Sequence, residues 1–105
     1  MKRMLLIFLL LPLGAYAADA DYTLTIKDHH FQPSEITIPS DKKVKLLVEN
    51  QDATPEEFDS YTLNREKVIA GNSSALIFIG PLTPGRYTFS GEFHATTAQG
   101  VIVAK

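Results

Sequence analysis

Four side chains that can bind a cation lie in two separate stretches of this 105-residue sequence. Glu56 and Glu57 follow Pro55 in a polar loop. Glu92 and His94 are spaced i, i+2, so both side chains could face one way from an extended segment. Carboxylates and an imidazole, without a thiolate, suit Cu(II), Fe(II), Fe(III), Mn(II) or Zn(II) better than Cu(I). If the two stretches converge, they predict a carboxylate–imidazole metal site.

Each of these groups also has an ordinary structural explanation. An acidic pair after a proline is often a solvated turn, because carboxylates are mostly exposed in proteins. Asp59 is a candidate for a further oxygen ligand or for a residue that orients a ligand. His29 and His30 are neighbours, and in a strand they would point to opposite faces, so both could bind one ion only where the chain bends. Asp28 and Pro33 are candidates for such a bend. We therefore expect solvent-exposed or structural roles for both histidines, or at most a second, peripheral site.

Short apolar stretches separated by turn residues must position these groups. The segments predicted as strands are 22–26, 35–38, 44–48, 58–63, 67–69, 75–79, 86–89 and 101–103. Segment 75–79 is nearly all apolar, which predicts a strand covered on both faces. One short helical turn fits at 54–58 or at 96–99. No stretch has useful helical periodicity, so the pattern predicts an all-β, Greek-key β-sandwich of seven to eight strands.

The N-terminal residues have the pattern of an export signal. Two basic residues precede an apolar run, 4–13, and residues 15–17 supply a small-x-small cleavage site. The run is shorter than the roughly 20 apolar residues that a transmembrane helix needs. We therefore expect a signal peptide, 1–17, and one exported soluble domain, 18–105, with an uncleaved N-terminal anchor as the alternative. The sequence contains no cysteine, so no disulfide stabilises this domain.

Removal of such a leader would make the domain more acidic. The whole sequence has 10 Lys and Arg against 12 Asp and Glu, a net charge of −2. Without the two basic residues of the leader the balance is eight against twelve, a net charge of −4. This charge argues against a nucleic acid or an anionic membrane as partner and suits capture of a cation. The sequence also lacks a cysteine nucleophile, a nucleophile-elbow serine and a glycine-rich phosphate loop, so it does not predict an enzyme acting alone.

Five segments of the second half carry a family resemblance. They are Ala53-Thr54-Pro55-Glu56-Glu57-Phe58, Leu63-Asn64-Arg65-Glu66-Lys67, Gly80-Pro81-Leu82 with Pro84-Gly85, Gly91-Glu92-Phe93-His94, and Thr97-Ala98-Gln99-Gly100. Together they resemble the cupredoxin-like domain of bacterial periplasmic iron-uptake systems. The first half, from Phe31 to Asn50, resembles only the general cupredoxin framework, the blue-copper β-sandwich.

The resemblance implies a cupredoxin site with changed ligands. In the small blue-copper pattern, a histidine stands where this chain has Glu56, the copper-binding cysteine falls at Gly91, and the axial methionine falls near Ala98. The absence of these sulfur ligands argues against fast outer-sphere electron transfer and leaves metal binding intact. The candidate metal ligands carried onto this chain are Glu56, Glu57, Glu92 and His94.

The resemblance further implies a periplasmic protein that binds a copper ion, an iron ion or both. Its expected role is to assist ferrous iron uptake, by supporting Fe(II) oxidation before transport. The expected partners are a membrane iron permease and other periplasmic iron-uptake proteins. Two alternatives remain: a periplasmic Cu(II) carrier, and a metal-free interaction module that docks on a permease.

Overall fold

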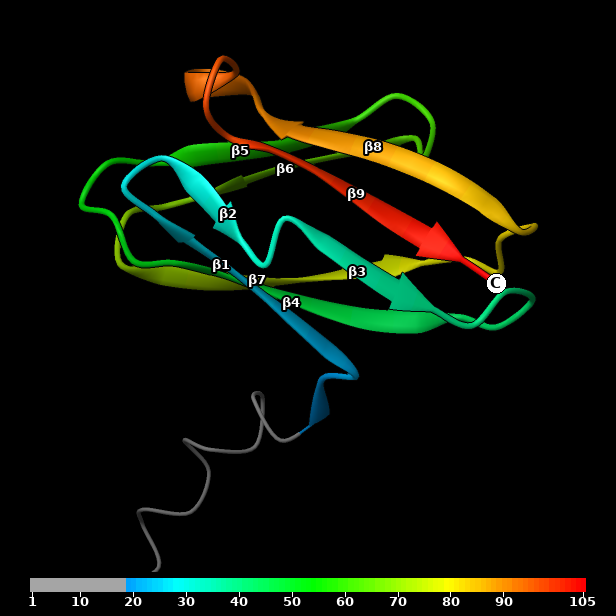
Figure 1. Cartoon of the computed structure of the whole chain (residues 1–105). Coiled ribbons are helices and arrows are strands. Elements are labelled where there is room, and N and C mark those ends of the chain that lie inside the picture. The colour runs from blue at the N-terminus through cyan, green and yellow to red at the C-terminus, as the bar shows by residue number, and fades with distance from the viewer. Residues whose placement is uncertain (1–18) are drawn as a thin grey trace, which may run out of the picture.

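The structure is a computed structural model of the chain and describes residues 19–105 (Figure 1). The expected signal peptide, 1–17, lies outside the described residues, and the expected domain is described from its second residue onward. Within residues 19–105, no helix has the length and apolar character needed to span a membrane.

Nine strands form two facing sheets in the described part of the chain (Figure 1). They are β1 (Tyr22–Lys27), β2 (His30–Gln32), β3 (Glu35–Ile38), β4 (Val44–Asn50), β5 (Glu56–Ser60), β6 (Arg65–Ile69), β7 (Ser73–Ile79), β8 (Gly85–Gly91) and β9 (Gln99–Ala104). One sheet has the order β2-β1-β4-β7 and the other the order β3-β9-β8-β5-β6. The β1–β4 and β3–β9 pairs are parallel, and the other pairs are antiparallel. This arrangement confirms the predicted all-β sandwich.

The ninth strand, β2, is the one that the sequence pattern did not predict. It spans only three residues, which is too few for an alternating pattern to be recognised. β2 pairs antiparallel with β1, and Lys27 lies opposite His30. Asp28 and His29 therefore form a two-residue hairpin turn, so the chain bends at Asp28, and His29 and His30 do not lie together in one strand.

Two further expectations about secondary structure are corrected. β7 is an edge strand of its sheet, and 47% of Phe78 is exposed, so segment 75–79 is not covered on both faces. The 3-10 helix η2 spans Glu92–His94 and not 54–58 or 96–99. β5 ends at Ser60, because residues 61–64 turn back into β6 and Asn64 adopts a left-handed conformation (φ 56°).

Three aromatic rings fill the core beside the start of β5. Phe58 and Phe89, both from the five-stranded sheet, stack with ring centroids 4.9 Å apart. Phe31 from β2 meets Phe89 edge-on at 4.8 Å, so the cluster joins the two sheets. All three residues are buried, and burial of each phenyl group contributes about 1.5–3 kcal/mol. The cluster gives a rigid base to the end of the sandwich at which β5 begins.

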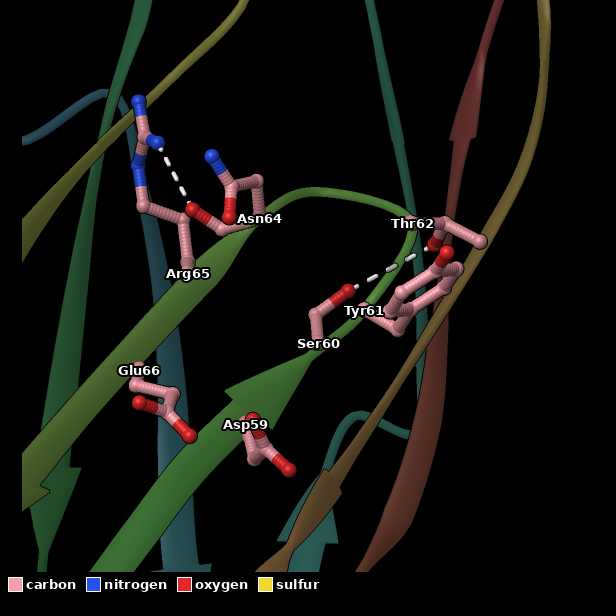
Figure 2. Close-up of a pocket in the computed structure, with 7 residues that line it drawn as sticks. All are labelled: Asp59, Ser60, Tyr61, Thr62, Asn64, Arg65 and Glu66. Atoms are coloured by element: carbon pink, nitrogen blue, oxygen red, sulfur yellow. Dashed lines mark hydrogen bonds between the residues drawn. The ribbon is translucent and has the colours of Figure 1, made fainter.

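The other end of β5 carries the β5–β6 hairpin and a shallow, open hollow (Figure 2). Ser60 Oγ closes the turn by donating to the Thr88 carbonyl (2.7 Å) and accepting from the Leu63 amide (3.1 Å). Arg65 Nε donates to the Phe78 carbonyl (2.9 Å), which links the two sheets. The polar groups here serve the turn and the sheet contact, so this end of the molecule has a structural explanation.

Candidate metal centre

Glu56 is a buried carboxylate at the first position of β5. Side chains alternate along a strand, so Glu56 points into the sandwich on the same side as Phe58. Only 2% of its side chain is exposed. Oε1 accepts hydrogen bonds from the amides of Glu57 (3.0 Å) and Phe93 (2.8 Å), and Oε2 lies 2.7 Å from Nδ1 of His94. A buried charge is costly unless such partners surround it, and here three donors do.

His94 ends the 3-10 helix that follows β8. Its Nδ1 faces a carboxylate that can only accept, so this nitrogen is the donor in the free protein. The side chain is 27% exposed, which leaves one edge of the ring open to solvent. Successive residues of a 3-10 helix are about 120° apart, so residues i and i+2 do not share a face. The expectation that Glu92 and His94 face one way from an extended segment is therefore wrong.

Glu57 lies on the opposite face of β5 from Glu56. Partial burial and then the negative charges of Glu66, Asp59 and Glu92 raise the pKa of the Glu57 carboxyl above its usual range. In the β5–β6 ladder, Asp59 stands directly opposite Glu66. We call the four residues on this outer surface, Glu57, Asp59, Glu66 and Glu92, the acidic patch.

The structure thus divides the four predicted ligands into two pairs. It brings Glu56 and His94 into contact across the chain, whereas Glu57 and Glu92 belong to the acidic patch. In the part of the chain that the structure describes, no three or more His, Cys, Asp or Glu side chains are grouped so that they could hold a metal ion as they stand.

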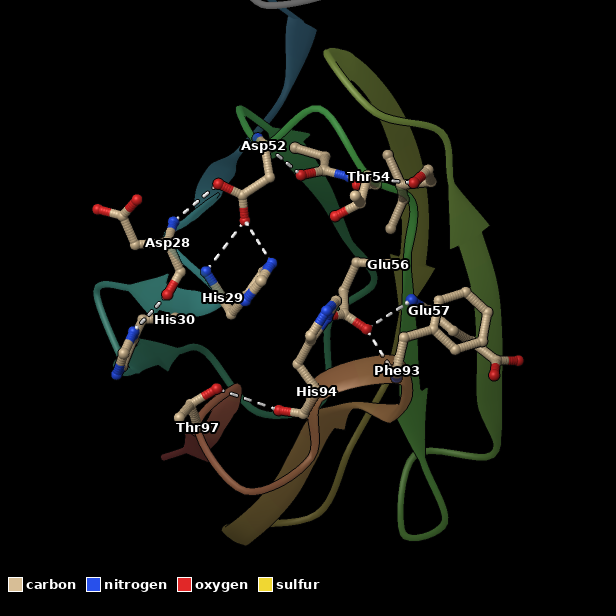
Figure 3. A network of polar contacts seen from close by, with 12 residues as sticks. Asp28, His29, His30, Asp52, Thr54, Glu56, Glu57, Phe93, His94 and Thr97 are labelled. Atoms are coloured by element: carbon tan, nitrogen blue, oxygen red, sulfur yellow. Dashed lines mark hydrogen bonds and ion pairs between the residues drawn. The ribbon is translucent and has the colours of Figure 1, made fainter.

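His29, from the β1–β2 turn, lies against the Glu56–His94 pair (Figure 3). Its ring stacks on the ring of His94, with centroids 3.6 Å apart and an interplanar angle of 10°. The sequence did not predict His29 at this site, because β2 was not recognised. An Asp-His pair between two strands is a weak turn signal, so little in the sequence could have shown this contact.

Asp52, in the β4–β5 loop, fixes this turn. Its Oδ1 accepts from the Asp28 amide (2.8 Å), and its Oδ2 accepts from the His29 amide (3.0 Å). Partial burial of Asp52 favours a higher pKa, but these two hydrogen bonds and the charge of nearby Lys27 together hold the pKa of the carboxyl below its ordinary value. Asp52 is therefore an ionised anchor for the turn.

The structure also tests whether a blue-copper ligand set fits. A Cβ at Gly91, where the resemblance places a cysteine, would lie 2.6 Å from Cδ of Glu56 and 2.8 Å from Cβ of Ala98. Both distances are shorter than real carbon contacts allow. The carboxyl group of Glu56 occupies the space of that cysteine, so a thiolate ligand set does not fit this chain.

A harder donor set fits better. Two ligands of one four-coordinate divalent ion lie about 3 Å apart or slightly more, since each bond is about 2.1 Å long. The 2.7 Å separation of Glu56 Oε2 and His94 Nδ1 is only a few tenths of an ångström shorter. One carboxylate and one imidazole are thus nearly in place for such an ion.

One curated relative has substantial sequence similarity. It is the uncharacterized protein RP394 of Rickettsia prowazekii (strain Madrid E), which is 45% identical over 80 residues. The match covers 76% of this chain, which spans only 64% of the length of the relative.

Solved structures of copper proteins share the fold. Auracyanin A, a "blue" copper protein from Chloroflexus aurantiacus, superposes with a TM-score of 0.68 at 14% identity, over 79% of this chain and 96% of its own. Amicyanin from Paracoccus versutus gives 0.65 at 16% identity, over 84% and 83%. At these identities the likeness shows the fold alone. The family described as "Cupredoxin-like domain" matches residues 3–104, and the chain belongs to this family.

Proposed function

We propose that this protein binds Cu(II) between Glu56 and His94 and works as a metal-binding protein. The observation that carries the proposal is the 2.7 Å contact between Glu56 Oε2 and His94 Nδ1. The resemblance to cupredoxins places the copper ligands at the same positions of the sequence. Imidazole suits Cu(II) well, and without a thiolate or thioether the set no longer favours Cu(I). The copper proteins among its structural neighbours support the choice of metal.

The residues of this chain would prepare the site in three ways. The amides of Glu57 and Phe93 fix Oε1 of Glu56, which leaves Oε2 directed at His94. The buried carboxylate supplies a negative charge, which stabilises the higher oxidation state of a bound metal. His94 binds a metal only as a neutral imidazole, so its Nδ1 proton would move through solvent to Nε2. Protons compete with the metal for the ring, so affinity should fall as the pH is lowered. Bound copper would supply one-electron redox chemistry with a preference for Cu(II).

Equilibrium dialysis with Cu(II), Zn(II), Fe(II) and Fe(III) tests this proposal. We expect one Cu(II) per chain with a Kd below about 10 µM, equivalent to about 7 kcal/mol of binding. His94→Gln should lose most of this affinity, and Glu57→Gln, which alters a carboxylate on the other face of the strand, should keep it. No binding of any of the four ions tighter than about 0.1 mM would contradict the proposal and favour a metal-free docking module.

A second candidate function is assistance of ferrous iron uptake in the periplasm, beside a membrane iron permease and other periplasmic iron-uptake proteins. The acidic patch favours it, because Glu57 and Glu92 add carboxylate oxygens on the far side of β5 from Glu56. Such oxygens stabilise Fe(III) relative to Fe(II), so binding would make iron easier to oxidise before transport. The electron would pass to an external acceptor, either bound copper or a partner protein. In the same dialysis, Fe(III) retained by wild type and lost on Glu57→Gln would support this role. Cu(II) retention alone would favour a carrier of Cu(II).

A further inference from the structure

We propose that His29 supplies a second imidazole to the Glu56–His94 centre, so that its metal ion is bound by two nitrogens and one carboxylate. The inference rests on the function proposed above and extends its ligand set. It is carried by the stack of the His29 and His94 rings, which have centroids 3.6 Å apart and planes within 10°. His29 follows β1 of the four-stranded sheet, and His94 follows β8 of the five-stranded sheet. The two rings meet at this end of the sandwich (Figure 3).

The conformation of the β1–β2 turn is unusual for the residues in it. Asp28 has φ 53° and His29 has φ 60°, so both lie in the left-handed region. A two-residue hairpin turn of this kind normally takes Asn-Gly or Asp-Gly, because a side chain at the second position crowds the backbone. Strain of this type persists where surrounding structure enforces it, and it concentrates at functional sites.

The loop that leads to Glu56 also enforces the position of His29. Asp52 holds the amides of Asp28 and His29, and its own amide donates to Oδ1 of Asn50 (3.0 Å). The buried Asn50 side chain donates in turn to the backbone carbonyls of Thr54, Ile69 and Ala70. One hydrogen-bonded loop therefore positions both His29 and Glu56, so the fold itself sets the distance between them.

The ring of His29 has nitrogens free to bind a ligand. Within residues 19–105, neither ring nitrogen of His29 makes a hydrogen bond, and Nε2 lies 4.0 Å from Oδ2 of Asp52, beyond hydrogen-bonding distance. In His30, by contrast, Nδ1 lies 2.8 Å from the Asp28 carbonyl. The His29 side chain is 43% exposed and that of His94 27%, so an ion can approach both rings from solvent. Rotation about the soft Cβ–Cγ bond can redirect each ring.

Charge around the stacked rings favours a cation. Asp52 lies beside His29 and Glu56 beside His94, so two carboxylates flank two imidazoles. With both rings neutral, the four side chains carry two negative charges. A divalent ion balances this charge, and its bonds to one nitrogen of each ring would replace the stacking contact.

Electron paramagnetic resonance of the Cu(II)-loaded protein counts the coordinated nitrogens directly. We expect wild type to show superhyperfine splitting from two nitrogens. His29→Asn should show one, with affinity weakened about tenfold or more, since even loss of an outer partner of a ligand costs about that much. Asparagine tolerates the left-handed region, and His29→Gly removes both the ring and the strain, so the two variants together guard against misfolding.

The matched control is His30→Asn, the same change at the neighbouring histidine, whose ring points away from the centre in Figure 3. It should leave the two-nitrogen spectrum and the affinity unchanged. If His29→Asn and His29→Gly both keep the wild-type spectrum and affinity, the inference is overturned while the proposed function stands. Wild type that binds no Cu(II), tested with the same samples, overturns both.

Discussion

The two faces of β5 carry acidic side chains in opposite circumstances. On the inner face, Glu56 is buried and surrounded by three hydrogen-bond donors. On the outer face, Glu57 and Asp59 have other carboxylates as neighbours, and partial burial together with these charges raises the pKa of Glu57. Burial disfavours the charged form of a carboxylate, and hydrogen-bond donors offset this cost where they surround the group. The buried one is stabilised by its partners, whereas the more exposed ones repel each other.

Among these predictions, Glu56→Ala should have the largest effect on stability. The change leaves the Glu57 and Phe93 amides and His94 Nδ1 without their acceptor, and it opens a cavity. We expect a loss of about 2–4 kcal/mol in the free energy of unfolding. Urea denaturation measures it, with Glu57→Ala as the control on the other face. A loss below about 0.5 kcal/mol, the usual range of surface changes, would show that Glu56 is not held as described.

Gly91→Ala tests whether the Glu56 carboxyl occupies the space of the cysteine. The new methyl group would meet Glu56 and Ala98 at 2.6 and 2.8 Å, so we expect about 1–3 kcal/mol of destabilisation from overpacking. In a Glu56→Ala background the loss should be smaller, because the larger of the two obstacles is gone. A double-mutant cycle of unfolding free energies measures the difference. Equal losses in the two backgrounds would place the obstacle elsewhere.

Asp52→Ala should have a smaller effect that depends on pH. Because the folded protein lowers the pKa of this carboxyl, its stabilisation is present above the ordinary value of 3.8 and is lost as the pH falls through the folded value. We expect a loss of about 1–2 kcal/mol near pH 7, from two backbone amides left without an acceptor. Unfolding curves of wild type and variant should converge at acidic pH. A difference independent of pH would argue against an ionised anchor.

Glu57→Gln should have the smallest effect, in the opposite direction. A raised pKa means that the charged form is disfavoured in the folded state, so the contribution of Glu57 is lost as the pH rises from 4.5 through the folded value. Removing the charge should therefore raise the midpoint of thermal unfolding slightly at pH 7. It should change nothing below about pH 4, where the carboxyl is protonated in both states. A lower midpoint at pH 7 would contradict the repulsion described for the acidic patch.

The strand pattern of this chain could be predicted from sequence, but the site could be predicted only in part. Apolar residues, alternating in some segments and continuous in 75–79, together with the turn residues between the segments, indicated eight of the nine strands. The proximity of Glu56 to His94 follows from the topology that the family resemblance implies. The His29 contact could not be predicted, since it depends on a two-residue turn held by Asp52, whose partners are distant in sequence. Nor could spacing show that η2 is helical, which separates Glu92 from His94.

Metal binding by His94 is tested most directly by nitrogen-15 NMR of the histidine side chains during titration with Zn(II), a diamagnetic substitute for Cu(II). We expect one equivalent to move the Nδ1 resonance of His94 to the range of a metal-bound imidazole, with the ring proton transferred through solvent to Nε2. Spectra in which Zn(II) shifts signals of the acidic patch while His94 Nδ1 keeps its proton and its bond to Glu56 would contradict metal binding by His94.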